Sequence, residues 1–354
     1  MALPSAQTGK SEFSTVLRQR IDNFFRDNNV SRKGGAVMAA KIVGGLFCYA
    51  ASYAALYAVS TNAWQFLALY IVHGFTQMFL LLNIAHDGNH NAISRHTFVN
   101  KALSFVFDIC GINSYMWRFL HNRGHHSNIN VCGEDEDVLA RNVLRFSPNV
   151  PRRPIHRYQH LYVWLVYGFS IFEHILIKDF EYFFFTDYSP VKKAKHPMSE
   201  YIWLFAGKLF YFTYMLLLPV LILHRSVFLV AGAYIAMHFL VDLSVQFVFQ
   251  TTHIIENSWF PRTREDFDDY TYHVLATTAD YATRSWLATT FLGGLNHHVV
   301  HHLCPGVCHT HYPHLTEIVR ETAREYRVPY REHPTMREAV VKHFLLLRRL
   351  ATQP

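Results

Sequence analysis

Residues 201–250 read YIWLFAGKLFYFTYMLLLPVLILHRSVFLVAGAYIAMHFLVDLSVQFVFQ, an apolar stretch with a short polar interruption at 224–226. A helix needs about 20 largely apolar residues to cross a hydrocarbon layer of roughly 30 Å. The stretch therefore predicts two membrane-spanning helices, 201–223 and 227–250. Their connector is so short that the two helices must form a tight hairpin.

The same pattern occurs near the N-terminus, where 36–59 and 63–84 are separated by Ser60-Thr61-Asn62. The sequence thus predicts an all-α integral membrane protein with four transmembrane helices in two hairpins. Lys41 and Lys208 interrupt two of the spans, and snorkelling or contact with a polar cavity is the ordinary explanation for such residues.

The remaining sequence lies on one side of the membrane if both hairpin turns lie on the other. It holds most of the 33 basic residues, against 26 acidic ones in the whole chain, so the positive-inside rule predicts that both termini are cytosolic. Segment 1–35 is expected to form a cytosolic amphipathic helix, with no signal-peptide pattern. Segments 85–200 and 251–354 are expected to be cytosolic or interfacial. The basic balance points to a membrane, and no nucleic-acid motif is present.

Two further apolar stretches, 102–117 and 161–185, are broken by charged residues and are expected to be interfacial. From Pro313 onward, charged and apolar residues alternate at helical spacing, which predicts a cytosolic helical cap. The chain shows no repeats or flexible linkers, so 1–354 is expected to form a single domain. Its five cysteines offer no disulfide framework and suit a reducing compartment.

Three histidine clusters follow apolar segments: HDGNH at 86–90, HNRGHH at 121–126 and HVVHH at 298–302. Side chains four residues apart share one face of a helix, so paired imidazoles can converge on a metal. In the second cluster this step pairs His121 with His125, and the adjacent His126 can reach a neighbouring ion. In the third cluster the ligands fall at i, i+3 and i+4.

One such cluster is weak evidence, because surface histidines are common. If the three clusters had no metal-binding role, eight histidines would have to fall at metal-ligand spacing by chance. Eight or more ligands exceed the needs of one ion, which favours two metals. Imidazole suits Fe, Zn, Cu and Ni, so spacing alone leaves the metal open.

The order HDGNH, HNRGHH, HVVHH, together with FQTTHIIE, LATTADYA and GGLNHHVVHHLCPGVCHTHYP, resembles the membrane fatty acid desaturases, and the front-end (delta-5/delta-6) type in particular. The resemblance covers nearly the whole chain. It implies two Fe ions bound by the box histidines and by one further histidine at the cytosolic exit of the last span, which matches His253. The implied ligands are His86, His90, His121, His125, His126, His253, His298, His301 and His302.

Several other residues have two readings. Asp87 and Asn296 lie beside the ligands and are candidates for orienting them, because outer partners fix the rings of metal-bound histidines. The acidic run 133–137 is either a solvated loop or a source of such carboxylates. Residues 118–123 contain two arginines that could bind an anionic acyl carrier or anchor lipid headgroups.

The chain also departs from the resemblance. His298 stands where many front-end members carry Gln, which weakens any transfer of double-bond position. A zinc site built from residues 304–314 is an alternative, although its C-x3-C-H spacing fits no strong zinc template. The haem motif HPGG of a fused cytochrome b5 is absent, so electrons are expected from a separate ferredoxin or from cytochrome b5 with its reductase.

The implied activity is O2-dependent desaturation of a fatty acyl chain, with O2 as co-substrate and the bilayer around the substrate. A fatty acyl hydroxylase or acetylenase would share the same site. A His-rich metal transporter is a rival from another class, although transporters place ligands near the middle of spans, and a catalytically silent scaffold is a third alternative. The acyl carrier and the membrane, bacterial inner membrane or endoplasmic reticulum, stay open.

Overall fold

The computed structural model of the chain describes residues 7–138, 143–185 and 195–353, and it is mostly helical. The described chain forms two compact units, each built from segments that are distant in sequence. Unit 1 consists of Met1–Gly35, His121–Tyr162 and Phe247–Pro354, and unit 2 consists of Ala36–Leu120 and Val163–Gln246.

Four helical stretches among the described residues are long and apolar enough to cross a membrane, as the sequence predicted. They are Ala36–Ala58, Ala63–Asn89, Met198–Leu223 and Val227–His253. The first is helix α2 and the last is α13. The second comprises α3 (Ala63–Leu80), a π-helical turn (Leu81–Ala85) and α4 (His86–Asn89), and the third comprises α11 (Met198–Phe212), a π-helical turn (Thr213–Leu217) and α12 (Leu218–Leu223).

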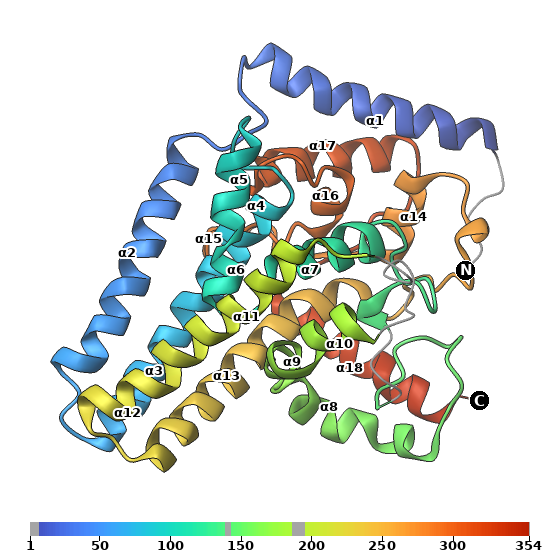
Figure 1. Cartoon of the computed structure of the whole chain (residues 1–354). Helices are drawn as coiled ribbons and strands as arrows, with labels where there is room; N and C mark the ends of the chain where they lie inside the picture. Colours follow the sequence, from blue (N-terminus) through green and yellow to red (C-terminus); the bar gives the residue numbers. More distant parts are fainter. Residues whose placement is uncertain (1–6, 139–142, 186–194, 354) are drawn as a thin grey trace. The chain divides into compact units, whose positions relative to one another are not determined.

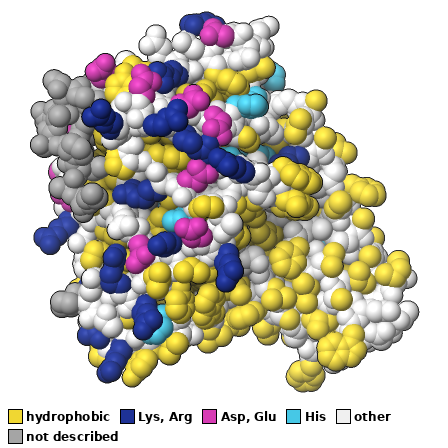
Figure 2. All heavy atoms as spheres, turned by 180° about the vertical axis from the view of Figure 1, so that it is seen from behind, with side chains coloured by type: hydrophobic (Ala, Val, Ile, Leu, Met, Phe, Trp, Pro, Cys, Tyr) yellow, Lys and Arg dark blue, Asp and Glu magenta, His cyan; other side chains and the backbone are white. Residues whose placement is uncertain are grey.

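Helices α2 and α3 pack side by side in unit 2 (Figure 1). The turn between them ends where the side-chain oxygen of Asn62 accepts a hydrogen bond from the Gln65 amide at 3.0 Å, which caps α3. Large apolar side chains point outward from this pair, including Phe47 at 71% and Trp64 at 80% exposure. Figure 2 shows the matching surface on its right-hand side, covered by hydrophobic side chains. Such a surface is suited to lipid contact.

The second span is longer than predicted, since its helix continues past Ile84 to Asn89. His86 therefore belongs to the same continuous helical rod as the span. The rings of His86 and His90 lie with their centroids 4.8 Å apart, in agreement with the predicted pairing across one helical turn.

The two lysines within the spans both have polar partners in unit 2. Lys41 Nζ donates to Asn83 Oδ1 at 2.7 Å. Lys208 is buried, and its Nζ lies 2.6 Å from Asp179 Oδ2 and donates to the Gly111 carbonyl at 2.6 Å. Lys208 thus neither snorkels nor faces an open cavity, but forms a buried ion pair.

The stretches expected to be interfacial form short helices. Residues 97–119 give α5 (Thr97–Ser104), α6 (Val106–Ile109) and α7 (Ser114–Phe119). Residues 154–184 give a 3-10 turn η5 (Pro154–Tyr158), then α8 (Gln159–Tyr167), α9 (Ser170–Glu173), the π-helical turn η6 (His174–Lys178) and α10 (Asp179–Phe184). The chain bends by 70° between Tyr167 and Ser170, so these helices do not make a straight span.

Unit 1 has its own apolar core. The long helix α1 (Gln7–Asp27) packs against α17 (Tyr312–Glu325), and its buried Phe13, Leu17 and Ile21 fall at helical spacing. Helices α14 (Tyr270–Thr277) and α16 (His298–Leu303) pack around them, and unit 1 also contains α15 (Trp286–Phe291) and α18 (Met336–Thr352). The amphipathic helices predicted at the two ends of the chain are therefore confirmed.

One detail departs from the all-α prediction. Strand β1 (Asp280–Tyr281) pairs in parallel with β2 (Glu332–His333), with Asp280 opposite Glu332. Strands of two residues are too short to show an alternating pattern in the sequence, so they could not be predicted from it. The pair joins the segment before the third histidine cluster to the segment before α18. All five cysteines are free thiols.

Helix α18 is held to the end of the last span by a buried histidine. His343 Nδ1 donates to the Ile254 carbonyl at 2.6 Å, and burial lowers the pKa of His343 from 6.5 to about 4. A lowered pKa in the folded state means that the unfolded chain binds more protons between these two values. The contribution of His343 to stability is therefore complete above pH 6.5 and is lost as the pH falls towards 4.

We expect wild-type protein to lose about 2 kcal/mol more stability than His343→Gln between about pH 7.5 and pH 5. Glutamine keeps an N–H donor for Ile254 but has no proton to gain. Thermal unfolding of the two detergent-purified proteins across this pH range measures the difference. A constant gap between their melting temperatures would show that His343 does not titrate on unfolding.

Candidate metal centre

Seven of the nine predicted ligands lie in unit 1, and His86 and His90 lie in unit 2. Those in unit 1 come from three places in the chain. The second cluster lies on a π-helical turn (Leu120–His125) and the residue after it, His253 ends α13, and the third cluster lies on α16.

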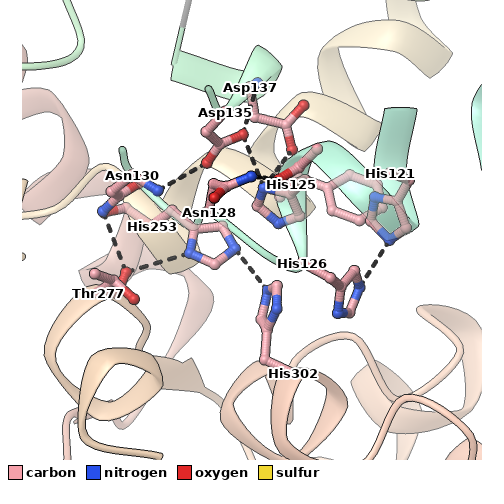
Figure 3. A network of polar contacts seen from close by, with 12 residues as sticks. His121, His125, His126, Asn128, Asn130, Asp135, Asp137, His253, Thr277 and His302 are labelled. Atoms are coloured by element: carbon pink, nitrogen blue, oxygen red, sulfur yellow. Dashed lines mark hydrogen bonds and ion pairs between the residues drawn. The ribbon is translucent and has the colours of Figure 1, made fainter. Parts of the chain in front are cut away.

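Four buried rings of unit 1 converge on one point. His125, His253, His298 and His302 each present one ring nitrogen, and these four nitrogens lie within 4.8 Å of one another. The Nε2 atoms of His253 and His302 are 3.0 Å apart, and Figure 3 shows this contact between the two rings. Neighbouring nitrogens around one ion lie roughly 3 to 4 Å apart when each metal–nitrogen bond is about 2.0–2.1 Å. The four rings fit a single transition-metal ion.

The other ring nitrogen of three of these histidines is fixed by an acceptor. His125 Nδ1 lies 3.0 Å from Asp135 Oδ1, and His253 Nδ1 lies 3.2 Å from the Thr277 carbonyl. His298 Nδ1 lies 3.0 Å from the Leu295 carbonyl. Each Nδ1 carries the hydrogen it donates, so Nε2 is the atom of each ring that is left to bind an ion. This arrangement is the one found around metal-bound histidines.

The protonation chemistry of the rings suits a metal. His125 Nε2 is buried and accepts or donates no hydrogen bond among the described residues, which leaves a costly orphan atom unless an ion is bound. Burial and the neighbouring imidazoles hold the pKa of His302 well below its usual range. His302 is therefore neutral, which is the form that binds metals.

His125 has the opposite electrostatic environment. Burial disfavours its charged form, but Asp135 and Asp137 outweigh burial and raise the pKa of His125 to about 9. Asp137 Oδ2 lies 3.3 Å from the same Nδ1. An ion at Nε2 would thus replace a proton while the Nδ1–H bond to Asp135 stays in place.

The second cluster is arranged differently from the expected i, i+4 pairing. In its π-helical turn the His126 amide donates to the His121 carbonyl at 2.9 Å, a five-residue step. This step brings the Nε2 atoms of His121 and His126 to 3.1 Å. His125 instead joins His253, His298 and His302. The rings of His126 and His301 have centroids 4.7 Å apart, so a second group of imidazoles adjoins the first within unit 1.

The adjacent histidines 297 and 298 have distinct environments. His297 has both ring nitrogens engaged by hydroxyls, with Nε2 2.9 Å from Thr289 Oγ1 and Nδ1 2.8 Å from Thr316 Oγ1. Burial lowers its pKa to about 4. His297 is a satisfied core histidine, and His298 is the one that joins the cluster.

The helix that carries the third cluster is fixed at its start. Asp280 Oδ1 accepts the Val299 amide at 2.8 Å, and Tyr330 donates its hydroxyl to Asp280 Oδ2 at 2.5 Å. The preceding turn includes Gly294 at φ +70°, where a Cβ would lie 2.9 Å from His309 Cβ. Glycine is required there by both conformation and space.

Two residues of the site were missed by sequence analysis. The Tyr270 hydroxyl lies 2.9 Å from the His126 carbonyl and 3.3 Å from the His302 carbonyl, so it joins the second and third clusters. Asn130 adopts φ +59°, and its side-chain amide donates to the carbonyls of Trp259 at 3.2 Å and His253 at 3.3 Å. The residue type was the only signal at Asn130, because Asn tolerates the left-handed region of backbone conformation. A lone Tyr such as Tyr270 gives no comparable signal.

The candidate orienting residues differ in their contacts. In the acidic run, Asp135 contacts His125 as described above. Its Oδ2 atom accepts a hydrogen bond from the backbone amide of Asn130 at 2.8 Å, so Asp135 is an ordered part of the site. Asn296 donates to the Ala282 carbonyl at 3.3 Å and to Thr289 Oγ1 at 3.2 Å, which fixes the turn before His298. Asp87 is buried, with Oδ1 3.8 Å from His86 Nδ1. In the alternative zinc site of residues 304–314, Cys308 and His309 present ligand atoms within 4.8 Å of each other, whereas Cys304, His311 and His314 join no such group among the described residues.

We expect Asp135→Asn to lower metal affinity by about 10- to 100-fold. The substitution removes the negative charge beside His125 Nδ1, and the new side-chain amide presents an N–H donor that competes with the Nδ1–H group. Metal retention during dialysis against a graded chelator measures the effect. Glu134→Gln is a control that makes the same charge change at the preceding residue, and its metal affinity should match that of the wild type. Equal retention by all three proteins would contradict an orienting role for Asp135.

Residues 62–334 match the family model described as fatty acid desaturase. An acyl-lipid (8-3)-desaturase of Physcomitrium patens is 33% identical over 98% of this chain and 73% of its own length. An sn-1 linoleoyl-lipid 6-desaturase of Arthrospira platensis is 29% identical over 98% of this chain and 95% of its own. Because the family model matches well over half of the chain, the chain belongs to the fatty acid desaturase family, membrane oxidoreductases that act on fatty acids.

Proposed function

We propose that the protein is an O2-dependent di-iron desaturase that introduces a cis double bond into a lipid-linked acyl chain. The observation that carries this proposal is the convergence of His125, His253, His298 and His302, four buried imidazoles that each bring one ring nitrogen within 4.8 Å of the others. A histidine-only donor set of this kind suits a borderline metal such as iron.

The number of donors supports two ions. His125, His253, His298 and His302 would hold one ion, with the ring orientations that Asp135, Thr277 and Leu295 impose. We assign the second ion to the remaining predicted ligands: His86, His90, His121, His126 and His301. The roles of His86 and His90 rest on the order of the histidine clusters in the sequence.

The overall reaction balances with a separate electron donor. One acyl –CH2–CH2– unit, O2, two electrons and two protons give one –CH=CH– unit and two waters. The bound irons supply the redox chemistry with O2, which no side chain can provide. We propose ferredoxin, or cytochrome b5 with its reductase, as the donor.

The residues of the chain position and isolate this chemistry. All four converging rings are at most 3% exposed, so bulk water is excluded from the site. Asp135 keeps a proton on His125 Nδ1, and Tyr270 holds the two clusters at a fixed separation through their backbone carbonyls. A rigid, dry ligand set of this kind is what metal-dependent redox catalysis requires.

The relatives guide the choice of substrate and location. Both are named for acyl-lipid substrates, which favours a lipid-linked chain over acyl-coenzyme A or acyl carrier protein. We further infer that the four long helices cross the membrane as two hairpins, and that both termini and the metal site are cytosolic. The family match extends across both units, which supports one functional desaturase domain in an endoplasmic-reticulum or bacterial inner membrane.

The first experiment is metal analysis of the detergent-purified protein, combined with fatty acid profiling of an expressing host. We expect two irons per chain and a new acyl species lighter by two hydrogens. A product that gains oxygen would identify a hydroxylase, and one that loses four hydrogens would identify an acetylenase. Zinc alone, or no metal, with an unchanged lipid profile would overturn the proposal.

A further inference from the structure

The helix formed by η5 and α8 has two unlike sides. His156, Gln159 and Val163 are buried on one side. On the other side, Ile155, Tyr158, Leu161 and Leu165 are exposed by 51%, 54%, 65% and 58%. Single exposed apolar residues are ordinary on a protein surface, but a continuous row along one helix face marks a contact surface.

Basic residues lie at the start of this row. Arg152, Arg153 and Arg157 are exposed, and residues 143–172 contain no Asp or Glu. The Arg157 guanidinium lies 5.7 Å from the ring centroid of Tyr158, so it stays beside the apolar row. The surface therefore combines an apolar stripe with three arginines that form no ion pair with any of the described residues.

The exposed row is not part of a straight transmembrane helix. The chain bends by 70° after Tyr167, at a position where Gly168 packs so tightly that a Cβ would lie 2.3 Å from Phe239 Cδ2. From Pro154 to Tyr167 the helix measures about 21 Å at 1.5 Å per residue, short of the roughly 30 Å of a hydrocarbon layer.

Hydrogen bonds to helix α18 fix the orientation of the row. Gln159 Nε2 donates to the Leu347 carbonyl at 2.8 Å, and Arg152 Nε donates to the Ala351 carbonyl at 2.8 Å. The buried Arg145 donates to the carbonyls of Leu350 at 3.0 Å and Gln353 at 2.7 Å. The carbonyls of Leu350 and Ala351 lie in the last turn of α18, where a helix cannot satisfy its own carbonyls. The apolar row is therefore held outward.

We propose that η5–α8 is an interfacial anchor that binds anionic phospholipid. Ile155, Leu161 and Leu165 enter the boundary between headgroups and acyl chains, and the three arginines bind lipid phosphates. A basic amphipathic helix lies in the membrane plane in this way, and guanidinium groups bind phosphate through paired N–H donors. The absence of acidic residues along the helix suits an anionic ligand, and the exposed apolar row beside the arginines favours a lipid over an acidic protein.

The charge component is tested on the full-length protein in detergent micelles that contain equal phosphatidylglycerol and phosphatidylcholine. Native mass spectrometry counts the lipids retained. We expect a preference for phosphatidylglycerol that falls by about tenfold in Arg152→Gln/Arg153→Gln/Arg157→Gln. The triple variant Arg324→Gln/Arg327→Gln/Arg337→Gln removes the same charge from exposed arginines elsewhere and should retain the preference. An equal loss in both variants, or no loss in the first, would overturn the proposal.

The apolar component is tested without altering the arginines. Photoreactive benzoylphenylalanine is placed at Leu161 or, as a control, at the exposed Leu345 of α18, and the protein is irradiated in nanodiscs that contain phosphatidylglycerol. We expect a lipid adduct at position 161 and none at position 345. No adduct at 161, equal adducts at both positions, or a protein adduct at 161 in native membranes would each contradict insertion of this helix. Neither test depends on desaturase activity.

Discussion

Replacing His298 with alanine is expected to remove one bound iron and to reduce desaturation below about 1% of wild type, since the loss of an orienting partner alone costs 10- to 100-fold. His298 is fully buried among His253, His302 and His125, and its Nδ1 is fixed by the Leu295 carbonyl. Alanine removes one of the four metal-ligand nitrogens, and the other three rings of the group cannot replace it. Metal analysis and product formation in an expressing host measure the two effects.

The adjacent His297 provides the control, because it is equally buried and one residue away in the chain. His297→Gln keeps groups that can bond to Thr289 and Thr316, so we expect full metal content and activity within about tenfold of wild type. If His297→Gln lost iron as His298→Ala does, burial of polar groups in this turn would explain both results. Full metal content in His298→Ala would exclude His298 as a ligand.

The second large effect is expected for the buried ion pair of unit 2. Lys208→Met should destabilise the protein by about 3–5 kcal/mol, because it leaves the Asp179 carboxylate buried without its cation. Asp179 is 0% exposed, and it would keep the Asn113 backbone amide at 2.9 Å and His174 Nε2 at 3.2 Å after the lysine is removed. The melting temperature of detergent-purified protein reports the loss.

Two further variants separate charge from packing. The double variant Lys208→Met/Asp179→Asn removes both charges and keeps an acceptor oxygen for Asn113, so it should recover most of the lost stability. Lys41→Met removes the other lysine within a span, whose partner is the neutral Asn83, and should cost about 1 kcal/mol. A double variant as unstable as the single one would show that Lys208 acts through its aliphatic stem.

The spans could be predicted from the sequence because hydropathy over about 20 residues is a local property. The predicted boundaries differ from the observed ones by at most five residues, with the largest difference where α3 continues through a π-turn to Asn89. The histidines were identifiable because their spacing is local too. His253 was the exception, since a lone histidine after a span has no spacing, and only the family resemblance indicated it.

The partners of these residues could not be predicted, because they are set by tertiary packing. Nothing in the sequence around Lys208 identifies Asp179, which lies on another helix 29 positions away. Tyr270 acts through its hydroxyl on the backbone of the His126 and His302 segments, and backbone acceptors leave no mark on residue type. The acidic run had two equal readings until the fold placed Asp135 against His125.

The π-helical turn at Leu120–His125 makes the second histidine cluster sensitive to its length. The His126 backbone amide bonds to the His121 carbonyl across five residues, so the number of residues between these rings matches the wider turn. Removing one residue from 122–124 would restore a normal α-helical register and rotate the following rings by about 100°. In evolution and in protein engineering, this cluster should accept new side chains between its histidines far more readily than insertions or deletions.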